Sequence, residues 1–313
     1  MRSDGWSTDG PVLLVDGGGT KTRAVLVGDD DQPLGEGRAG PSNLMLGTRN
    51  ARAEVEVACG KAISALGPTD ALPTELPLCC AMAGAGNRHL CEAFSADGKR
   101  PAILVSDAYA AMVGALGGEP GVGIVVGTGS AAFCLAEDGS VREAGGWGPA
   151  IGDEGSGAWI GRAAVSLAAK IIDGQSDILL NGSSRSDLLA FVERRVSATG
   201  RTRTTLLEWV REASPADFAK LSPAILDDAT SGNTVAIALL NKAVSDLEDL
   251  RACLDPSGKL PVALIGGLAE PMGRFLSGAL VKNLIRNRGD AIDGLLAMAR
   301  GRVPAEDMSE RPI

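Results

Sequence analysis

Two glycine-rich turns carry the residues of this chain that are best suited to bind a polyphosphate. The first spans residues 16–20 and the second spans residues 127–130. Glycine has no Cβ atom, so its backbone N–H group can approach phosphate oxygens closely, and a threonine hydroxyl adds a donor. A tight hairpin turn is the competing interpretation, but it would need only two glycines. The residues that predict phosphate binding are Asp16, Gly17, Gly18, Gly19, Thr20, Gly127, Thr128, Gly129 and Ser130.

Asp16 needs a different partner, because a carboxylate does not bind phosphate directly. It could hold Mg²⁺ through water, since Mg²⁺ keeps much of its hydration shell when it is bound to a nucleotide. The chain has no Gly-x-x-x-x-Gly-Lys-Ser/Thr loop and no Gly-x-Gly-x-x-Gly turn from strand to helix. The commonest other ways of binding a nucleotide are therefore excluded.

Asp107 is the candidate for acid–base chemistry. It follows the apolar run of residues 102–106 and precedes a helical pattern. This places it at the carboxyl end of a predicted parallel strand, where α/β folds gather their active groups. A carboxylate there can accept the proton of an attacking hydroxyl in phosphoryl transfer. Alternatively, Asp107 caps the helix, a role for which Ser106 is also suited, and position alone leaves both interpretations open.

Residues 145–161 combine many glycines with two tryptophans and an acidic pair. This composition is poor for a regular element but suits a sugar site, because it offers close backbone approach, an aromatic surface and acceptors for hydroxyl groups. We expect Asp153 to accept hydrogen bonds from sugar hydroxyls, with Glu154 beside it. Trp159 is expected to pack in the helix that follows.

Two further positions depend on their context. Gly266 and Gly267 follow an apolar strand and leave room for a flat ring, so their loop is a candidate for contact with adenine and ribose. A plain turn from strand to helix explains them nearly as well. Asn43 is a turn residue by default.

The elements that must position these residues form a repeated pattern. Residues 12–27 predict a strand, a turn and a strand, because aliphatic and β-branched residues flank the glycines, and residues 34–40 add a third short strand. A comparable unit returns at residues 123–146. Two copies of one three-stranded unit predict two similar lobes.

Strands alternate with helices after these units, which predicts α/β layers with parallel pairing. The expected buried strands cover residues 76–84, 102–106 and 260–267. The expected helices cover residues 49–66, 88–96, 108–116, 156–172, 186–197, 203–212, 215–228, 232–253 and 288–302. We place one lobe at residues 11–116, completed by the last helix (288–302), and the second at residues 117–287.

Composition narrows the class of protein. The net charge of −9 opposes capture of nucleic acid or of an anionic membrane surface. No stretch is apolar enough to span a membrane, and the first residues lack a secretory pattern, so we expect a soluble cytoplasmic protein that acts on a small molecule. The cysteines show no CxxC spacing, which predicts free thiols and no structural metal. Cys79 and Cys80 are expected in a buried strand.

Together these motifs resemble the N-acetylglucosamine kinase and glucosamine kinase family, within the BadF/BadG/BcrA/BcrD-type ATPase group of the actin/hexokinase/Hsp70 superfamily. The resemblance spans nearly the whole chain and rests on the segments DGGGTKT, VSDAYAA, GTGS, GGWGPAIGDEGSG, IGGLAEP and GDAIDGLLAMAR. It implies an α/β fold with two ribonuclease H-like (actin-like ATPase) lobes and a nucleotide cleft between them. It also implies transfer of the γ-phosphoryl group of ATP, with Mg²⁺, to the 6-hydroxyl of N-acetylglucosamine or glucosamine.

The resemblance also implies roles for individual residues, with Asp107 as the base that activates the 6-hydroxyl. The implied sugar-binding residues are Asn43, Ser130, Gly145, Gly146, Trp147, Asp153 and Glu154. The implied ATP-binding residues are Asp16, Gly17, Gly18, Gly19, Thr20, Lys21, Thr128, Gly129, Gly266 and Gly267, with Asp16 also holding Mg²⁺. The expected partner is a small amino sugar, without nucleic acid or membrane. Relatives are often dimers, but the sequence has no apolar stripe that marks an interface.

Three alternatives compete with a kinase that acts on glucosamine or N-acetylglucosamine. Pro149 and Ala150 stand where relatives often have bulkier residues, which bears on the fit around an N-acetyl group and keeps N-acetylmuramic acid as an alternative acceptor. An ATPase that activates a partner reductase shares the hairpin motifs, but it holds an iron–sulfur cluster through cysteine near the segment where this chain has GDEGSG. A non-catalytic sugar sensor would need a broken base or phosphate loop, and both are intact here.

Overall fold

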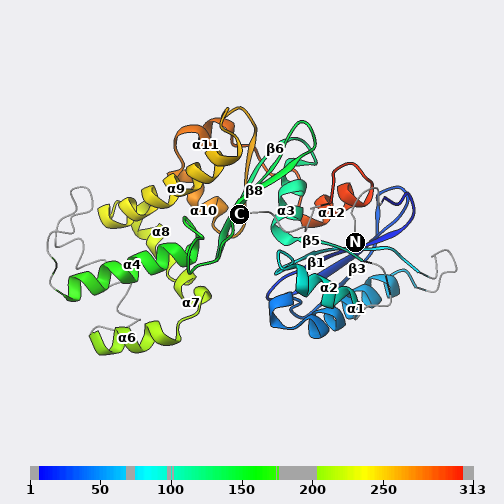
Figure 1. The fold of residues 1–313 in the computed structure, drawn as a ribbon, viewed down its shortest axis with the longest axis horizontal. Coiled ribbons are helices and arrows are strands. Elements are labelled where there is room, and N and C mark those ends of the chain that lie inside the picture. Colours follow the sequence, from blue (N-terminus) through cyan, green and yellow to red (C-terminus); the bar gives the residue numbers. More distant parts are fainter. Residues whose placement is uncertain are drawn as a thin grey trace. The chain divides into compact units, whose positions relative to one another are not determined.

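The structure is a computed structural model, and it describes residues 7–67, 75–96, 100, 102–173, 175 and 203–305. The chain divides into two compact units (Figure 1). Unit 1 comprises Met1–Gly121, Leu135–Val141 and Arg286–Ile313, and unit 2 comprises Val122–Cys134 and Arg142–Ile285. The helix predicted over residues 186–197 lies outside the described residues.

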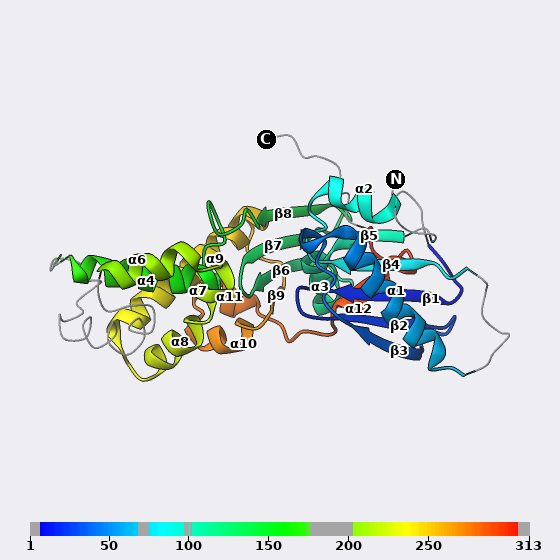
Figure 2. The same ribbon diagram turned by 90° about the horizontal axis from the view of Figure 1, so that it is seen from below.

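Unit 1 is built on a five-stranded sheet in the order β3-β2-β1-β4-β5, whose strands lie side by side in Figure 2. The strands are β1 (Val12–Gly17), β2 (Thr22–Val27), β3 (Pro33–Ala39), β4 (Leu78–Met82) and β5 (Ala102–Ser106). The first three form an antiparallel meander. Strand β4 pairs in parallel with both β1 and β5. The predicted meander and the parallel pairing that follows it are both confirmed.

Helices cover both faces of this sheet (Figure 1). On one face lie α1 (Thr48–Ser64) and α2 (Arg88–Ala96), and a short 3₁₀ turn, η1 (Leu44–Leu46), precedes α1. Alternate strand residues such as Leu13 and Val15 point into the same buried cluster as Val55 of α1 and Phe94 of α2. On the other face, α3 (Asp107–Leu116) and α12 (Ala291–Ala299) pack on the sheet and on each other.

Two glycines let α3 and α12 cross with their backbones in contact. A Cβ atom at Gly114 would lie 1.7 Å from the carbonyl oxygen of Asp290, and one at Gly294 would lie 2.0 Å from that of Ala110. No side chain fits at such distances, so both positions require glycine. Helix α3 begins at Asp107, and this crossing therefore fixes the element that carries the candidate base.

The Arg300 side chain, 7% exposed, ties the end of α12 to the first strands of unit 1. It donates to the carbonyl oxygens of Thr8, Gly10 and Gly28 at 2.6, 2.8 and 2.6 Å, and to Asp31 Oδ1 at 2.7 Å. The hydrogen bonds that Arg300 and Arg302 donate to Asp31 lower the pKa of its carboxyl. The last helix is thus anchored in unit 1 by hydrogen bonds as well as by packing.

Unit 2 repeats the three-stranded unit in a sheet of order β8-β7-β6-β9. Its strands are β6 (Gly121–Val126), β7 (Ser130–Leu135), β8 (Val141–Gly145) and β9 (Val262–Ile265). Strand β9 pairs in parallel with β6, as strand β4 does with β1. The repeat predicted from residues 12–40 and 123–146 is confirmed as two three-stranded units, each extended by a parallel strand.

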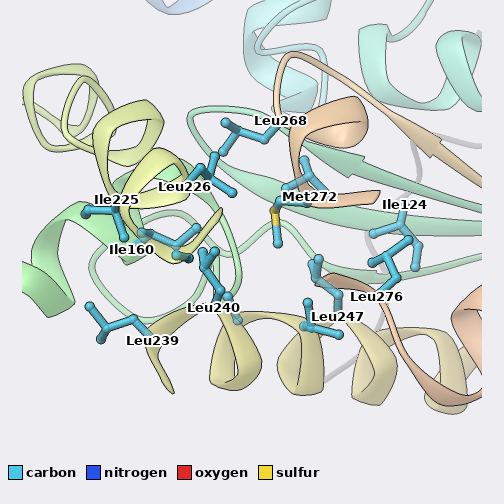
Figure 3. Packing of buried hydrophobic residues seen from close by; sticks show 14 of the residues in the cluster. Ile124, Ile160, Ile225, Leu226, Leu239, Leu240, Leu247, Leu268, Met272 and Leu276 are labelled. Atoms are coloured by element: carbon cyan, nitrogen blue, oxygen red, sulfur yellow. The ribbon is translucent and has the colours of Figure 1, made fainter. Parts of the chain in front are cut away.

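The helices of unit 2 enclose a large apolar core (Figure 3). They are α4 (Gly157–Ile172), α6 (Arg203–Glu212), α7 (Pro215–Ala219), α8 (Ser222–Thr230), α9 (Thr234–Leu254), α10 (Ala269–Met272) and α11 (Gly278–Asn283), with a 3₁₀ turn η3 (Gly273–Phe275). The core joins Ile160 of α4, Ile225 of α8, Leu240 of α9 and Met272 of α10. Trp159 packs against this cluster, as predicted.

The helix predicted over residues 215–228 is wrong as a single element, because the structure has two helices there, α7 and α8. Pro223 stands in the first turn of α8 and has no N–H group to bond the carbonyl of Ala219 four residues earlier. The Ser222 hydroxyl donates to that carbonyl instead, at 2.7 Å. The proline therefore ends one helix and starts the next.

The cysteine predictions are also tested. All six cysteines are free, as predicted. Cys79 and Cys80 are fully buried in β4, and burial raises the pKa of the Cys79 thiol to about 12.

Among the described residues, no helix has both the length and the apolar character needed to cross a membrane.

Candidate active site

The first hairpin tip, residues 17–21, connects β1 and β2. The Gly18 N–H donates to the carbonyl of Lys21 at 3.0 Å. Packing requires glycine only at position 17, where a Cβ atom would lie 2.5 Å from Ser42 Oγ and 2.6 Å from Met82 Sδ. A Cβ atom at Gly19 would meet no atom within 4 Å, and Gly19 has no positive φ. The fold therefore does not explain the glycine at position 19, and its contact with phosphate stays a prediction.

Asp107 lies at the carboxyl end of β5, as predicted, but it does not cap the helix. The Ser106 hydroxyl is the cap, because it accepts the N–H of Tyr109 at 3.0 Å. The Asp107 carboxylate is half-buried and accepts the N–H of Ala108 at 3.0 Å. Burial raises the pKa of Asp107, while the backbone N–H groups of Ala108 and of Asp107 itself oppose the rise. Of the two interpretations of Asp107 that the sequence left open, the structure excludes capping, because Ser106 is the cap.

Asp107 and Asp290 are both close enough to Asp16 to interact with it electrostatically. Burial of Asp16, followed by the charges of Asp107 and Asp290, raises the pKa of Asp16, whereas Lys21 and Arg23 lower it. The Arg23 guanidinium bridges Asp290 Oδ2 at 2.8 Å and Glu36 Oε2 at 3.2 Å.

The position of Asp290 near Asp16 was not predicted from the sequence. Its segment, GDAID, carried only the signal of a helix start, and Asp290 does cap α12 by accepting the N–H groups of Ile292 and Asp293. Its second contact, with Arg23, comes from 267 residues away in the chain. No local pattern could have indicated that contact.

Asp16 fits a magnesium ion only if water completes the coordination shell. Among the described residues, no group of three or more His, Cys, Asp or Glu side chains is arranged to hold a metal ion. Asp16 and Asp107 instead repel each other, as the raised pKa of Asp16 indicates, and a divalent cation would relieve that repulsion. Mg²⁺ commonly binds through one or two carboxylates and several waters, so the residues suit it.

Asn43 lies beside the first hairpin tip. It caps η1, since its Oδ1 atom accepts the N–H of Met45 at 2.9 Å. Its neighbour Ser42 donates its backbone N–H to the carbonyl of Gly18 at 3.0 Å, and Leu44 bonds Ala83 after β4 at 2.9 Å. These bonds hold Asn43 at the ends of β1 and β4, the same edge of the sheet as Asp16.

The second hairpin tip, residues 127–130, connects β6 and β7 and is bonded to the first turn of α4. The carbonyls of Gly127 and Thr128 accept the N–H groups of Gly157 and Ala158 at 2.8 and 3.1 Å. Within the described part of the chain, no hydrogen bond uses the N–H groups of Thr128 and Gly129. The carbonyl groups of this tip are thus occupied, whereas the N–H groups of Thr128 and Gly129 are not used within the described residues.

The substrate loop, residues 145–156, follows β8 and is rich in left-handed backbone. Glycines 145, 146, 148 and 155 all have positive φ, and so does Asp153 at +60°. Trp147 is 70% exposed and Glu154 is exposed, whereas Asp153 is 7% exposed. Burial raises the pKa of Asp153, and the backbone N–H groups of Gly148 and Ser130 oppose the rise.

Hydrogen bonds join the substrate loop to the second hairpin tip. The Ser130 hydroxyl donates to the carbonyl of Glu154 at 2.7 Å, and the Gly146 N–H donates to the carbonyl of Ser130 at 3.0 Å. Unit 2 therefore brings together the candidate sugar residues 145–147 and 153–154 with the candidate phosphate residues 128–130.

Gly266 and Gly267 follow β9 at the end of β6. Gly266 has φ +102°, and a Cβ atom there would lie 2.5 Å from the carbonyl oxygen of Val126, so the fold itself requires this glycine. A Cβ atom at Gly267 would meet nothing within 4 Å. The turn interpretation accounts for Gly266, while Gly267 keeps its predicted role at an open backbone.

The predicted site residues thus gather in two groups. Unit 1 holds Asp16, the first hairpin tip, Asn43 and Asp107, and unit 2 holds the second hairpin tip, the substrate loop and the Gly266-Gly267 turn. The first group provides carboxylates beside a glycine tip, and the second provides free amide donors beside a polar loop. Their roles toward ligands remain predictions.

Known proteins are similar to this chain in sequence and in fold. Residues 14–292 match the BadF/BadG/BcrA/BcrD ATPase family. The chain is 30% identical over 289 residues to the glucosamine kinase of Vibrio cholerae serotype O1, across 91% of this chain and 94% of that protein. It is 26% identical over 309 residues to an N-acetylmuramic acid/N-acetylglucosamine kinase of Clostridium acetobutylicum, across 92% of this chain and 98% of that protein. A solved structure from Chromobacterium violaceum, provisionally named an N-acetylglucosamine kinase, matches with a TM-score of 0.79 and 33% identity, covering 93% of this chain and 100% of that one.

The fold and the glycine tips define an ATPase-type α/β protein, and the ribonuclease H-like (actin-like ATPase) class predicted from sequence is confirmed. The chain belongs to the BadF/BadG/BcrA/BcrD ATPase family.

Proposed function

We propose that this protein transfers the γ-phosphoryl group of ATP to the 6-hydroxyl of glucosamine or N-acetylglucosamine, with Asp107 as the general base. The coarser statement, that the protein is an ATP-dependent amino-sugar kinase, follows from its family and from relatives named as kinases of amino sugars that align with more than nine-tenths of the chain. The acceptor atom and the residue roles rest on the arguments below.

The environment of Asp107 is the observation that carries the proposal. Its carboxylate is half-buried at the carboxyl end of β5, and the capping role that would otherwise explain it belongs to Ser106. Burial raises the pKa of Asp107, which makes the carboxylate a stronger proton acceptor than an exposed one. These properties suit a general base in phosphoryl transfer.

The mechanism follows from this assignment. The Asp107 carboxylate takes the proton of the sugar hydroxyl while that oxygen attacks the γ-phosphorus, and ADP leaves. Backbone N–H groups at the two hairpin tips offset charge on the phosphate oxygens. We assign ATP contacts to Gly17, Gly18, Gly19, Thr20, Lys21, Thr128, Gly129, Gly266 and Gly267, and sugar contacts to Asn43, Ser130, Gly145, Gly146, Trp147, Asp153 and Glu154.

Magnesium is part of the proposal. When bound, Mg²⁺ would supply positive charge that stabilises the transferring phosphoryl group. Asp16 is the residue that we assign to hold it through water, because its carboxylate interacts electrostatically with Asp107 and its pKa is raised by burial and by the negative charges around it.

A coupled assay of ADP release tests the function. We expect ATP turnover to be stimulated by glucosamine or N-acetylglucosamine, and glucose serves as the comparison acceptor without a nitrogen substituent. N-acetylmuramic acid belongs in the same panel, because the kinase from Clostridium acetobutylicum carries that sugar in its name. If no amino sugar stimulates ADP release, the proposal is wrong.

A pair of glycine variants in the first hairpin tip tests its role in ATP binding. Gly19→Ala should raise KM for ATP by about tenfold at an unchanged melting temperature, because its methyl group enters open space that we assign to phosphate. Gly17→Ala should lower the melting temperature instead, because its methyl group would collide with Ser42 and Met82. Steady-state kinetics and thermal unfolding separate the two effects. An unchanged KM in Gly19→Ala would remove position 19 from the ATP site.

A further inference from the structure

Asp153 holds a backbone conformation that needs a physical reason. Its φ of +60° lies in the left-handed region, which residues other than glycine seldom adopt, and its side chain is buried. Glycine, which the chain uses at positions 152 and 155, would adopt this conformation without strain. A buried aspartate in this conformation persists where contacts of its side chain hold it.

The Asp153 carboxylate contacts both the substrate loop and the second hairpin tip. Its Oδ1 atom accepts the N–H of Gly148 at 3.1 Å. Its Oδ2 atom lies against Gly129, where an added Cβ atom would be only 2.7 Å away. The backbone N–H of Ser130 also faces this carboxylate. One side chain therefore spans the two segments, and its position leaves room for nothing larger than glycine at 129.

Ser130 makes a second connection between the same segments. Its hydroxyl donates to the carbonyl of Glu154 at 2.7 Å, and its own carbonyl accepts the N–H of Gly146 at 3.0 Å. The hydroxyl is buried with its residue, which is 4% exposed. Because a buried hydrogen bond is costly to break, these contacts hold the tip and the loop as one body.

These connections leave the N–H groups of Thr128 and Gly129 unused within the described residues. The carbonyls of Gly127 and Thr128 bond α4, and within the described residues no hydrogen bond uses the N–H groups of Thr128 and Gly129. A tip fixed in this way presents its donors without further ordering, so less conformational entropy is lost when a phosphate binds. The affinity for a nucleotide then depends on the groups that fix the tip.

We propose that Asp153 and Ser130 are positioning residues that lock the second hairpin tip to the substrate loop and thereby set the affinity for ATP before any sugar is bound. This inference rests on the proposed function. It adds a second role to the sugar contacts that we assign to these two residues, because sugar contacts alone would change only the affinity for sugar.

Nucleotide binding in the absence of sugar separates the two roles. The affinity of a non-hydrolysable ATP analogue with Mg²⁺ is measured by calorimetry on the full chain. Asp153→Ala and Ser130→Ala should each raise its Kd by about tenfold. Asp153→Asn should restore most of the affinity, because an asparagine oxygen can accept the N–H of Gly148 and asparagine tolerates a left-handed backbone. Ile151→Ala is the control, since this side chain lies in the same loop but is 77% exposed, and its Kd should not change.

The outcomes distinguish this inference from the proposed function. Unchanged Kd in both Asp153→Ala and Ser130→Ala, together with a raised KM for sugar, would overturn the positioning role and leave the kinase assignment standing. Failure of the wild-type protein to bind the ATP analogue would overturn both. Ser130→Ala removes only one hydroxyl, so it decides the question even if Asp153→Ala does not fold. For Ser130→Ala, a raised KM for ATP would provide the same support in turnover assays.

Discussion

Replacing Asp107 by asparagine should lower kcat of the sugar kinase reaction by about 10²–10⁴-fold, the usual range for loss of a general base. The KM values for ATP and for sugar should stay close to those of the wild type. Asparagine has nearly the same shape and can still accept the N–H of Ala108, so the start of α3 should not move. Coupled ADP-release kinetics measure both parameters.

The pKa of Asp107 adds a pH dependence to this prediction. Burial raises the pKa above its ordinary value of 3.8, so the active, ionised form is lost as pH falls through that raised pKa. The acid limb of kcat/KM in the wild-type protein, which reports ionisation of the free enzyme, should therefore lie above pH 3.8. The residual activity of Asp107→Asn should lack this limb.

At neutral pH, Asp107→Asn should raise the stability of the folded protein although it lowers the activity. A carboxyl group whose pKa is higher in the folded protein binds its proton more tightly there, so the folded state loses stability as pH rises from 3.8 through the raised pKa. At neutral pH the ionised Asp107 is a net cost, and Asp107→Asn should melt at a higher temperature than the wild type. Below pH 3.8 this electrostatic contribution to the difference should vanish.

Near wild-type turnover in Asp107→Asn would remove Asp107 as the base. Asp153 is then the next candidate, because its side chain is buried and burial raises its pKa as well. An unfolded variant would instead indicate that the side chain is structural, which circular dichroism detects before any kinetic comparison.

Gly294→Ala should lower the free energy of unfolding by about 2–3 kcal/mol or more. Its Cβ atom would lie 2.0 Å from the carbonyl oxygen of Ala110, and backbone cannot move aside as a flexible side chain can. The helices α3 and α12 would have to separate. Because α3 carries Asp107 at its first residue, kcat should fall as well. Urea denaturation gives the stability, and ADP release gives the turnover.

Gly60→Ala is the matched control. Gly60 also lies inside a helix, α1, but an added Cβ atom there would meet nothing within 4 Å. Alanine favours a helix over glycine by about 1 kcal/mol, so this variant should be more stable than the wild type. If Gly294→Ala were stabilised to the same extent, the close crossing of α3 and α12 would be wrong.

Local signals explain which elements could be predicted. The strands around each glycine turn were predicted because β-branched and aliphatic residues lie immediately on both sides of it, and the structure places β1, β2, β6 and β7 there. The split of residues 215–228 was missed although its cause is local. Pro223 follows Ser222, and a proline in the first turn of a helix leaves the apolar spacing unbroken.

The different roles of two glycines in one turn, and the choice between two possible helix caps, could not be predicted from the sequence. Gly17 and Gly19 are the same residue type in the same turn, but only Gly17 faces Ser42 and Met82, which come from later parts of the chain. Asp107 was a candidate both for the base and for the helix cap, and Ser106 also suited the cap, until the structure showed that Ser106 accepts the N–H of Tyr109.

The sequence by itself determined the glycine turns, the repeated three-stranded units and the placement of a carboxylate after an apolar strand, because each depends on residues a few positions apart. Only the tertiary structure decided which glycines are packed and which are open, and that Asp290 lies near Asp16. It also decided that Asp153 spans the second hairpin tip and the substrate loop. The physical reason is that these properties depend on burial, charge and contacts among segments distant in the chain, and no local pattern of residues encodes such contacts.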